Sequence, residues 1–107
     1  MFNRLFIDDE RFPCQDDWAI VRSSNEAIEW VTLHGMPEEI SFDHDLGEDD
    51  TSRVFIKWVT EQMIDGLLHF PVNFKYSVHS QNPIGAEWIM GTMDLLIRCY
   101  HTFPQYD

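Results

Sequence analysis

Short apolar runs alternate along the chain with longer segments in which apolar residues recur at helical spacing. The short runs are candidate strands, and the apolar residues of the first one, over residues 4–8, are continuous rather than alternating, a pattern typical of buried parallel strands. The short runs cover residues 4–8, 19–21, 40–42 and 73–78. The sequence therefore predicts about four short, mainly parallel strands.

The longer segments have the periodicity of amphipathic helices and carry helix start signals. Ser23 and Glu26 have the spacing of a capping box, and Asn82 followed by Pro83 is a favourable helix start. Helices are expected from Ser23 to Gly35, from about Ser52 to Ile64 and from Asn82 onward, with buried sides formed by Ala27, Ile28 and Val31, by Val54, Phe55, Trp58, Val59 and Met63, and by Trp88, Ile89, Met93, Leu96, Ile97 and Tyr100.

This order of elements predicts a single α/β domain over residues 1–107. Its expected architecture is a compact sheet of about four mainly parallel strands with helices on both faces. The connection over residues 9–17 is unusual, because parallel strands usually need about a dozen or more connecting residues. It is expected to be a loop with at most one helical turn.

Composition supports a folded globule, since hydrophobic residues make up 44% and aromatic residues 14% of the chain. Asp and Glu total 19 against 7 Lys and Arg, which gives a formal net charge of −12. Direct nucleic-acid binding is not expected, because it depends on Lys and Arg. The charge maintains solubility or attracts a basic protein partner. An acidic crevice would accept a phosphate only after a cation had reversed the local field.

No apolar run is long enough to cross a bilayer, and the first residues lack a signal-peptide pattern. A cytoplasmic protein without membrane association is therefore expected. Its two cysteines have no metal-ligand spacing, and thiols are the expected state in the cytoplasm, although the sequence also permits one disulfide. Cys99 is expected in the core and Cys14 in a loop.

Polar residues follow three of the predicted strands at the points where those strands end. They are Asp8, Asp9 and Glu10 after the first strand, Asp43, His44 and Asp45 after the third, and His79 and Ser80 after the fourth. The carboxyl ends of parallel strands meet at one edge of a sheet, where ligands of open α/β sheets bind. The sequence therefore predicts one crevice for a divalent cation and a phosphate.

Asp8, Asp9 and Asp43 are the candidate metal ligands. Mg²⁺ suits them because it prefers oxygen ligands and keeps several waters, and Mn²⁺ is an alternative. Zn²⁺ also becomes an alternative if a histidine binds. Strand alternation lets at most one of Asp8 and Asp9 point directly into the crevice, and Asp9 is the better placed. Glu10 is either a third ligand or a solvated loop acid.

Asp43 and Asp45 flank His44 in a segment that allows two geometries. Extended backbone would place both carboxylates on one side and His44 on the other, whereas a tight turn at Gly47 would gather all three. Asp45 is a candidate ligand or catalytic residue. Alternatively, one of the two acids only caps the helix that begins near Ser52.

His44 and His79 are the candidate acid and base, because imidazoles can take both roles near neutral pH. The alternative for each is a hydrogen-bonded structural histidine. Ser80 and Asn82 lie close to a helix N-terminus, where free N–H groups bind anions. They are candidate phosphate-binding residues, and one of them is expected to cap the helix.

Residues 5–10, Leu-Phe-Ile-Asp-Asp-Glu, resemble the start of a response-regulator receiver domain. In receivers an acidic pair after the first strand binds magnesium, an aspartate after the third accepts phosphate, and a hydroxyl residue follows the fourth. The matching positions are Asp8 and Asp9, then Asp43 or Asp45, then Ser80. The fifth strand of receivers, with its lysine, has no expected counterpart.

Three linked segments, Asp-Asp-Glu-Arg, Ser-Phe-Asp-His-Asp-Leu-Gly and Val-His-Ser-Gln-Asn-Pro-Ile-Gly-Ala, are similar to a small receiver-like family. This family comprises the cyclic-phosphate-processing receiver domains of phage and bacterial conflict systems. The similarity spans about residues 4–90. It implies a compact receiver-like, flavodoxin-like fold without the fifth strand, and a nucleotide-derived cyclic phosphate as the substrate.

Two hypotheses for the function follow. The first is a metal-dependent phosphoesterase that acts on a cyclic phosphate, in the host cytoplasm if a phage encodes it. The second is a non-enzymatic receiver-like binding module or inhibitor that engages a basic host protein. Ordinary phosphorelay signalling is disfavoured, because the lysine of the fifth strand has no counterpart.

Overall fold

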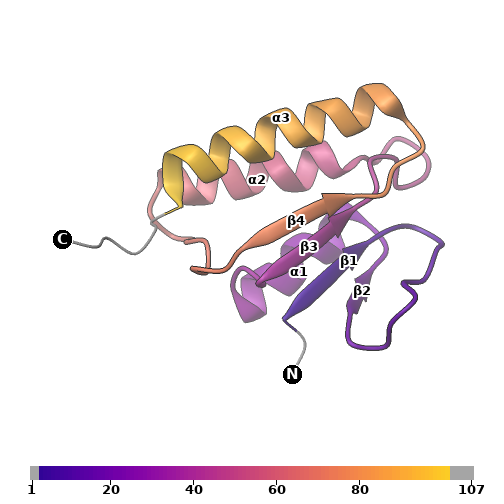
Figure 1. Ribbon diagram of the computed structural model, residues 1–107, viewed down its shortest axis with the longest axis horizontal. Coiled ribbons are helices and arrows are strands. Elements are labelled where there is room, and N and C mark those ends of the chain that lie inside the picture. The colour runs from indigo at the N-terminus through magenta and orange to yellow at the C-terminus, as the bar shows by residue number, and fades with distance from the viewer. Residues whose placement is uncertain (1–2, 102–107) are drawn as a thin grey trace.

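The structure, a computed structural model, describes residues 3–101 as four strands and three helices around one sheet (Figure 1). In chain order the elements are β1 (Arg4–Ile7), β2 (Ala19–Val21), α1 (Ser24–His34), β3 (Glu39–Phe42), α2 (Ser52–Ile64), β4 (Lys75–Val78) and α3 (Pro83–Tyr100). The strand order is β2-β1-β3-β4 and every neighbouring pair is parallel. The predicted receiver-like α/β fold with four parallel strands is confirmed.

The register brings the carboxyl ends of the strands level with one another. Ile7 is paired with Val21 on one side and with Phe42 on the other, and Phe42 is paired with Val78. The segments that follow β1, β3 and β4 therefore leave the sheet at the same edge. This is the edge at which the sequence places its acidic and histidine residues.

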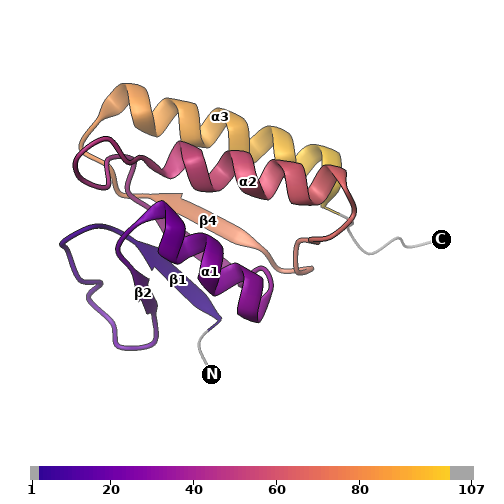
Figure 2. The same cartoon turned by 180° about the vertical axis from the view of Figure 1, so that it is seen from behind.

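All three helices pack on the same face of the sheet, which corrects the expectation of helices on both faces. Their buried residues form one cluster with Leu5, Ile7, Ile40 and Phe42 of the strands. Viewed from behind, α1 and α2 lie in front of the strands and α3 runs alongside α2 (Figure 2). The physical reason is that the β2-to-β3 and β3-to-β4 crossovers step the same way across the sheet, and right-handed crossovers then share a face.

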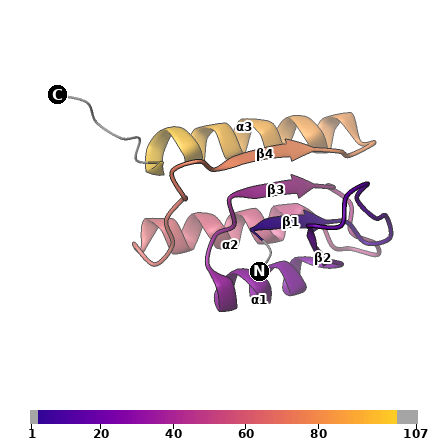
Figure 3. The same ribbon diagram turned by 60° about the horizontal axis from the view of Figure 1, so that its bottom comes forward.

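The opposite face of the sheet is covered in part by the loop between β1 and β2. This loop contains no helix, so the helical turn considered for residues 9–17 is absent. Trp18, at its end, packs edge-on against Phe6 of β1 at 5.9 Å between ring centroids. The Arg4 guanidinium lies 4.0 Å from the centroid of the Trp18 ring. In a third view the strands lie in front of α2, with α3 above them and α1 below (Figure 3).

The capping signals at the helix starts are confirmed, one of them in modified form. The Ser23 side chain accepts a hydrogen bond from the Glu26 backbone N–H at 3.1 Å, as in a capping box. The Glu26 carboxylate instead accepts from the backbone N–H of Arg22, one residue earlier than expected. Asn82 caps α3 by accepting from the Gly85 N–H at 3.1 Å.

Some residues expected on the buried sides of helices are exposed. Val54 is 47% exposed and Tyr100 is 40% exposed. Cys99 is also exposed, so its prediction as a core residue is wrong, whereas Cys14 lies exposed in a loop as expected, and both are free thiols. The reason is that each helix contacts the sheet along a narrow stripe, so residues beside that stripe face solvent.

Two further expectations concern the ends of the chain and membranes. The absence of a fifth strand was expected partly from residues 102–107, which lie outside the described residues together with residues 1–2. Among the described residues, no helix combines the length and apolar character needed to span a bilayer.

Tyr76 of β4 joins the sheet to α3 and should make stability sensitive to alkaline pH. Its hydroxyl donates to the Asp94 carboxylate at 2.6 Å, and burial together with Asp94 raises the pKa of Tyr76 well above its ordinary value. A raised pKa in the folded state gives stability that is present below pH about 10 and lost as pH rises further. We expect the free energy of unfolding, measured in urea, to stay level up to pH about 9.5, to fall from there to pH about 11.5, and to fall less in Tyr76→Phe. Equal losses in both proteins would contradict this expectation.

Candidate metal and phosphate site

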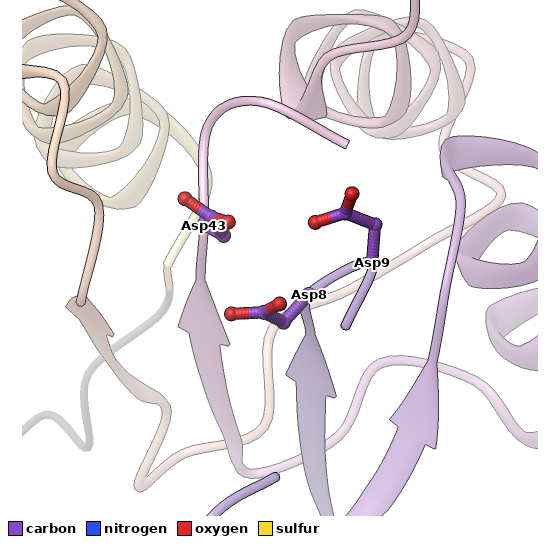
Figure 4. Close-up of side chains that lie close together, drawn as sticks. All are labelled: Asp8, Asp9 and Asp43. Carbon is purple, nitrogen blue, oxygen red and sulfur yellow. The ribbon is translucent and has the colours of Figure 1, made fainter. Parts of the chain in front are cut away.

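Three aspartates converge at the carboxyl edge of the sheet (Figure 4). Asp8 and Asp9 follow β1 and Asp43 follows β3, and one carboxylate oxygen of each lies within 4.8 Å of those of the others. Asp9 and Asp43 border a crevice of about 450 Å³, whereas the buried Asp8 does not line it. This acidic crevice is lined by Asp9, Glu10, Arg11, Asp43, Asp45, Gly47, Gln81 and Asn82. The predicted meeting of the first and third strand ends is therefore present in the structure.

Asp8 is the buried anchor of the site, with no solvent-exposed surface. Its Oδ1 accepts the backbone N–H groups of Glu10 and Arg11, and its Oδ2 accepts from Arg11 Nε at 2.8 Å and contacts His79 Nε2 at 3.0 Å. Burial acts to raise the pKa of Asp8, but these hydrogen bonds and the Arg11 charge outweigh it and hold the pKa below its ordinary value. Asp8 is therefore an ionised carboxylate that fixes the loop after β1.

Of the three converging aspartates, Asp9 and Asp43 line the crevice, as the alternation of side chains predicted for Asp9. Asp43 accepts the backbone N–H of His44 through Oδ1 at 2.9 Å. Asp9 lies close to Gly47, where an added Cβ would stand 3.2 Å from its Oδ2. Gly47 also has φ of 87°, a conformation that favours glycine. Because glycine has no side chain, this side of the crevice stays open.

Arg11 lies between two of the acids and supplies a positive charge that no local sequence pattern indicated. Its guanidinium pairs with Asp8 at 2.8 Å and with Asp43 at 3.3 Å, and it also donates to the His79 carbonyl at 3.3 Å. Its side chain is 41% exposed and lines the crevice. Arg11 is thus placed both to balance two carboxylates and to meet an anion from solvent.

His79 lies on the far side of Asp8 from the crevice. Its Nε2 contacts Asp8, and its Nδ1 contacts the Ser41 hydroxyl at 2.7 Å. The ring stacks on Phe6 with centroids 4.5 Å apart and an interplanar angle of 6°. His79 therefore lies on the sheet face opposite the helices and does not line the acidic crevice.

His44 is buried between the start of α2 and the start of α3. The Arg53 Nε–H can only donate, so His44 Nε2 accepts from it at 2.9 Å and Nδ1 carries the proton donated to Asp45. An added Cβ at Gly85 would lie 2.4 Å from the His44 ring, so the imidazole fills the space left by that glycine. His44 and His79 do not share a pocket, and each has both ring nitrogens in hydrogen bonds. The structural alternative considered for each histidine fits these contacts.

Residues 43–45 combine features of the two geometries considered for them, because the chain bends at His44 and the His44 ring contacts Asp45 at 2.9 Å. Asp43 and Asp45 both line the crevice, and His44 does not. The His44 hydrogen bond, the largest influence, holds the pKa of Asp45 below its ordinary value. Neither acid caps α2, because Thr51 does so by accepting from Arg53 N–H.

Ser80 and Asn82 act first as local structural groups. Ser80 Oγ accepts the Asn82 backbone N–H at 3.0 Å, and Asn82 caps α3 and donates to Asp45 at 3.3 Å. Asn82 lines the crevice together with Gln81, which was not predicted, whereas Ser80 does not line it. Nothing in the local sequence pattern singled out Gln81, because its position depends on the turn that follows β4.

The donor set of the crevice fits a hard divalent cation. Mg²⁺ prefers carboxylate oxygens and retains several waters, so two or three aspartates suffice. Most of the hydrogen-bonding capacity of Asp8 is already used, which leaves Asp9 and Asp43 as the acids best able to offer oxygens. No histidine nitrogen lines the crevice, so the oxygen set favours Mg²⁺ or Mn²⁺ over Zn²⁺.

Comparisons with known proteins agree with this geometry. No curated protein and no solved structure matches the chain. The family described as the cyclic-phosphate processing receiver domain matches residues 3–95, which include all four strands and most of α3. The expected relationship is thus confirmed, and the chain belongs to the family of cyclic-phosphate processing receiver domains.

Proposed function

We propose that this domain is a metal-dependent phosphoesterase that opens a nucleotide-derived cyclic phosphate. The observation that carries this proposal is the convergence of Asp8, Asp9 and Asp43 beside the Arg11 guanidinium. Carboxylates alone would repel a phosphate, so the crevice needs a cation for this chemistry. The family description, which associates the receiver fold with cyclic phosphates, supports the same substrate class.

The residues of the crevice divide into a cation-binding group and an anion-binding group. Asp9 and Asp43 would hold Mg²⁺ or Mn²⁺, with Asp8 fixing the loop that carries Asp9. The bound cation would supply Lewis-acid polarisation of the phosphoryl group and a lowered pKa for attacking water. Once a cation neutralises the acids, Arg11 is free to hold a phosphoryl oxygen. The side-chain amides of Gln81 and Asn82 border the same space and can orient that group.

The proposed roles of the acid–base residues follow from their hydrogen bonds. Asp45 lines the crevice, and its lowered pKa keeps it ionised at neutral pH, so it orients water rather than donating a proton. His44 positions Asp45 through its Nδ1–H. His79 is the proposed proton donor to the leaving alkoxide, because its Nε2 and Arg11 Nε both contact Asp8 Oδ2, and it would donate after its Nε2 leaves Asp8.

Asp43→Asn tests the cation site. We expect this variant to bind Mn²⁺ at least about tenfold more weakly in calorimetry, because it loses one anionic oxygen donor. Adenosine 2′,3′-cyclic phosphate should be hydrolysed by the unmodified protein with Mg²⁺ and not by the variant. Asp49→Asn removes the same charge from an exposed loop acid and serves as the matched control.

Three outcomes separate the hypotheses. Equal Mn²⁺ affinity in Asp43→Asn and Asp49→Asn would refute the assigned cation site. Metal uptake without turnover of any cyclic phosphate would favour a non-enzymatic binding module, with its net charge of −12 directed toward a basic protein. Turnover that persists in a variant carrying both His44→Ala and His79→Ala would remove the histidines from the mechanism.

A further inference from the structure

A second hollow lies next to the acidic crevice, on the face of the sheet opposite the three helices of residues 3–101. Its volume is about 330 Å³. This aromatic hollow is lined by Phe6, Arg11, Phe12, Pro13, Cys14, Gln15, Trp18 and His79. Arg11 also lines the acidic crevice, so the two spaces adjoin at its side chain.

The rings of the aromatic hollow are arranged with open surface for stacking. Phe12 is 73% exposed in the loop between β1 and β2. One face of its ring is covered by the Arg22 guanidinium at 4.6 Å from the centroid. Trp18 and His79 are held in place by their contacts with Phe6. The hollow is therefore preorganised by packed aromatic groups.

The aromatic lining of the hollow and its position beside Arg11 suit a planar group attached to a phosphate. Aromatic side chains stack on nucleic-acid bases without requiring a particular base. A ligand whose phosphate lies by Arg11 in the acidic crevice can extend past the same arginine into the aromatic hollow. A nucleoside 2′,3′-cyclic phosphate carries both parts on one sugar, with the base on C1′ and the phosphate bridging O2′ and O3′ on the opposite face of the ring. The hollow is close to the lower end of the range of about 300–1,000 Å³ for small-molecule pockets.

We propose that the aromatic hollow binds the base of the nucleotide whose cyclic phosphate occupies the acidic crevice, with Phe12 as the stacking platform. This inference rests on the proposed function and adds a specificity: the substrate is a nucleoside cyclic phosphate rather than a cyclic phosphate of a sugar alone. In this arrangement the ribose crosses Arg11 and lies beside His79, the proposed proton donor to its oxygen.

The test compares three probes with saturating Mg²⁺: adenosine 2′,3′-cyclic phosphate, the base-free methyl riboside 2′,3′-cyclic phosphate, and adenosine. Affinities are measured by calorimetry, and binding in the hollow is followed by the indole N–H resonance of Trp18. Phe12→Ala should raise the Kd of the adenosine cyclic phosphate about tenfold, the loss expected for one base-stacking contact, and should not change that of the base-free compound. Leu33→Ala, at an apolar residue of α1 that is 80% exposed, is the matched control and should change neither.

The outcomes distinguish this inference from the proposed function. If the base-free compound binds the unmodified protein as tightly as the nucleoside compound, the base site is refuted and the phosphate site stands. Equal nucleoside affinities in Phe12→Ala and Leu33→Ala would also refute the base site. If only adenosine binds, and Phe12→Ala abolishes its effect on Trp18, the base site is supported and the phosphate site is refuted. Failure of all three probes would refute both and leave the hollow to an apolar side chain of a protein partner.

Discussion

Asp8→Asn should lower the free energy of unfolding by about 3 kcal/mol, the lower end of the range of about 3–5 kcal/mol for breaking a buried ion pair. The substitution preserves volume, so no cavity contributes. Oδ1 can still accept the two backbone N–H groups, but the new amide nitrogen would face the Arg11 Nε–H. His79 can change tautomer to accept from that nitrogen, whereas Arg11 cannot lose its proton. Because the Arg11 side chain is 41% exposed and can turn toward water, the low end of the range applies.

Urea denaturation at pH 7 measures this loss against Asp16→Asn, which removes an exposed acid from the same loop. The control should stay within about 0.5 kcal/mol of the unmodified protein, as surface substitutions usually do. A loss of about 3 kcal/mol is a large part of the roughly 5–15 kcal/mol that stabilises a typical domain. If Asp8→Asn matched Asp16→Asn, Asp8 would not be the anchor described above.

Gly85→Ala should destabilise the protein by about 1–3 kcal/mol or more, through overpacking at the start of α3. The new Cβ would lie 2.4 Å from His44 Cγ and 2.7 Å from Cδ2 and Nδ1. His44 cannot move aside cheaply, because Asp45 and Arg53 hold both of its ring nitrogens. We therefore expect a lower midpoint of urea unfolding and a displaced His44 ring in NMR spectra. Asp45, which His44 positions, should lose its orientation at the crevice as well.

Gly91→Ala is the matched control, since it makes the same chemical change in the same helix. Apart from the adjoining residues and backbone of α3 itself, no atom lies within 4 Å of the Cβ it would add, and alanine favours helix by up to about 1 kcal/mol over glycine. Gly91→Ala should therefore stabilise the protein slightly while Gly85→Ala destabilises it. Opposite signs within α3 separate the steric effect from helix propensity, and equal effects at both positions would contradict the packing described for His44.

The acidic cluster was predictable because it depends on strand direction alone. Once Asp8, Asp9 and Asp43 follow strands that run in parallel, they must meet at one edge of the sheet. Arg11 ends the Asp-Asp-Glu-Arg segment, three residues after Asp8, but no ion pair or ligand contact was predicted for it. A turn after β1 brings Arg11 back toward Asp8, so recognising that turn in the sequence could have indicated the Arg11–Asp8 ion pair. Its second contact, with Asp43, depends on a residue 32 positions away and is not encoded in any local pattern.

The two histidines also show which features a local sequence pattern predicts and which depend on tertiary packing. The sequence placed His44 and His79 at the correct strand ends, but their separation into different spaces follows from side-chain packing. His44 turns toward Arg53 and Gly85, and His79 toward Ser41 and Phe6. Phe42 and Val78 are paired, so His44 follows β3 by two residues and His79 follows β4 by one. Side chains alternate between the two sides of a strand, and each imidazole then binds the polar groups on its own side.

By itself, the sequence determined the order of strands and helices, the parallel sheet and the edge at which its acids meet, because hydrophobic periodicity and capping residues act over a few positions. Only the tertiary structure decided that all three helices share one face, that Arg11 pairs with two of the acids, and that an aromatic hollow opens beside them. These features depend on contacts between segments far apart in the chain. Their geometry is set by the direction of each crossover and by packing, neither of which a local pattern specifies.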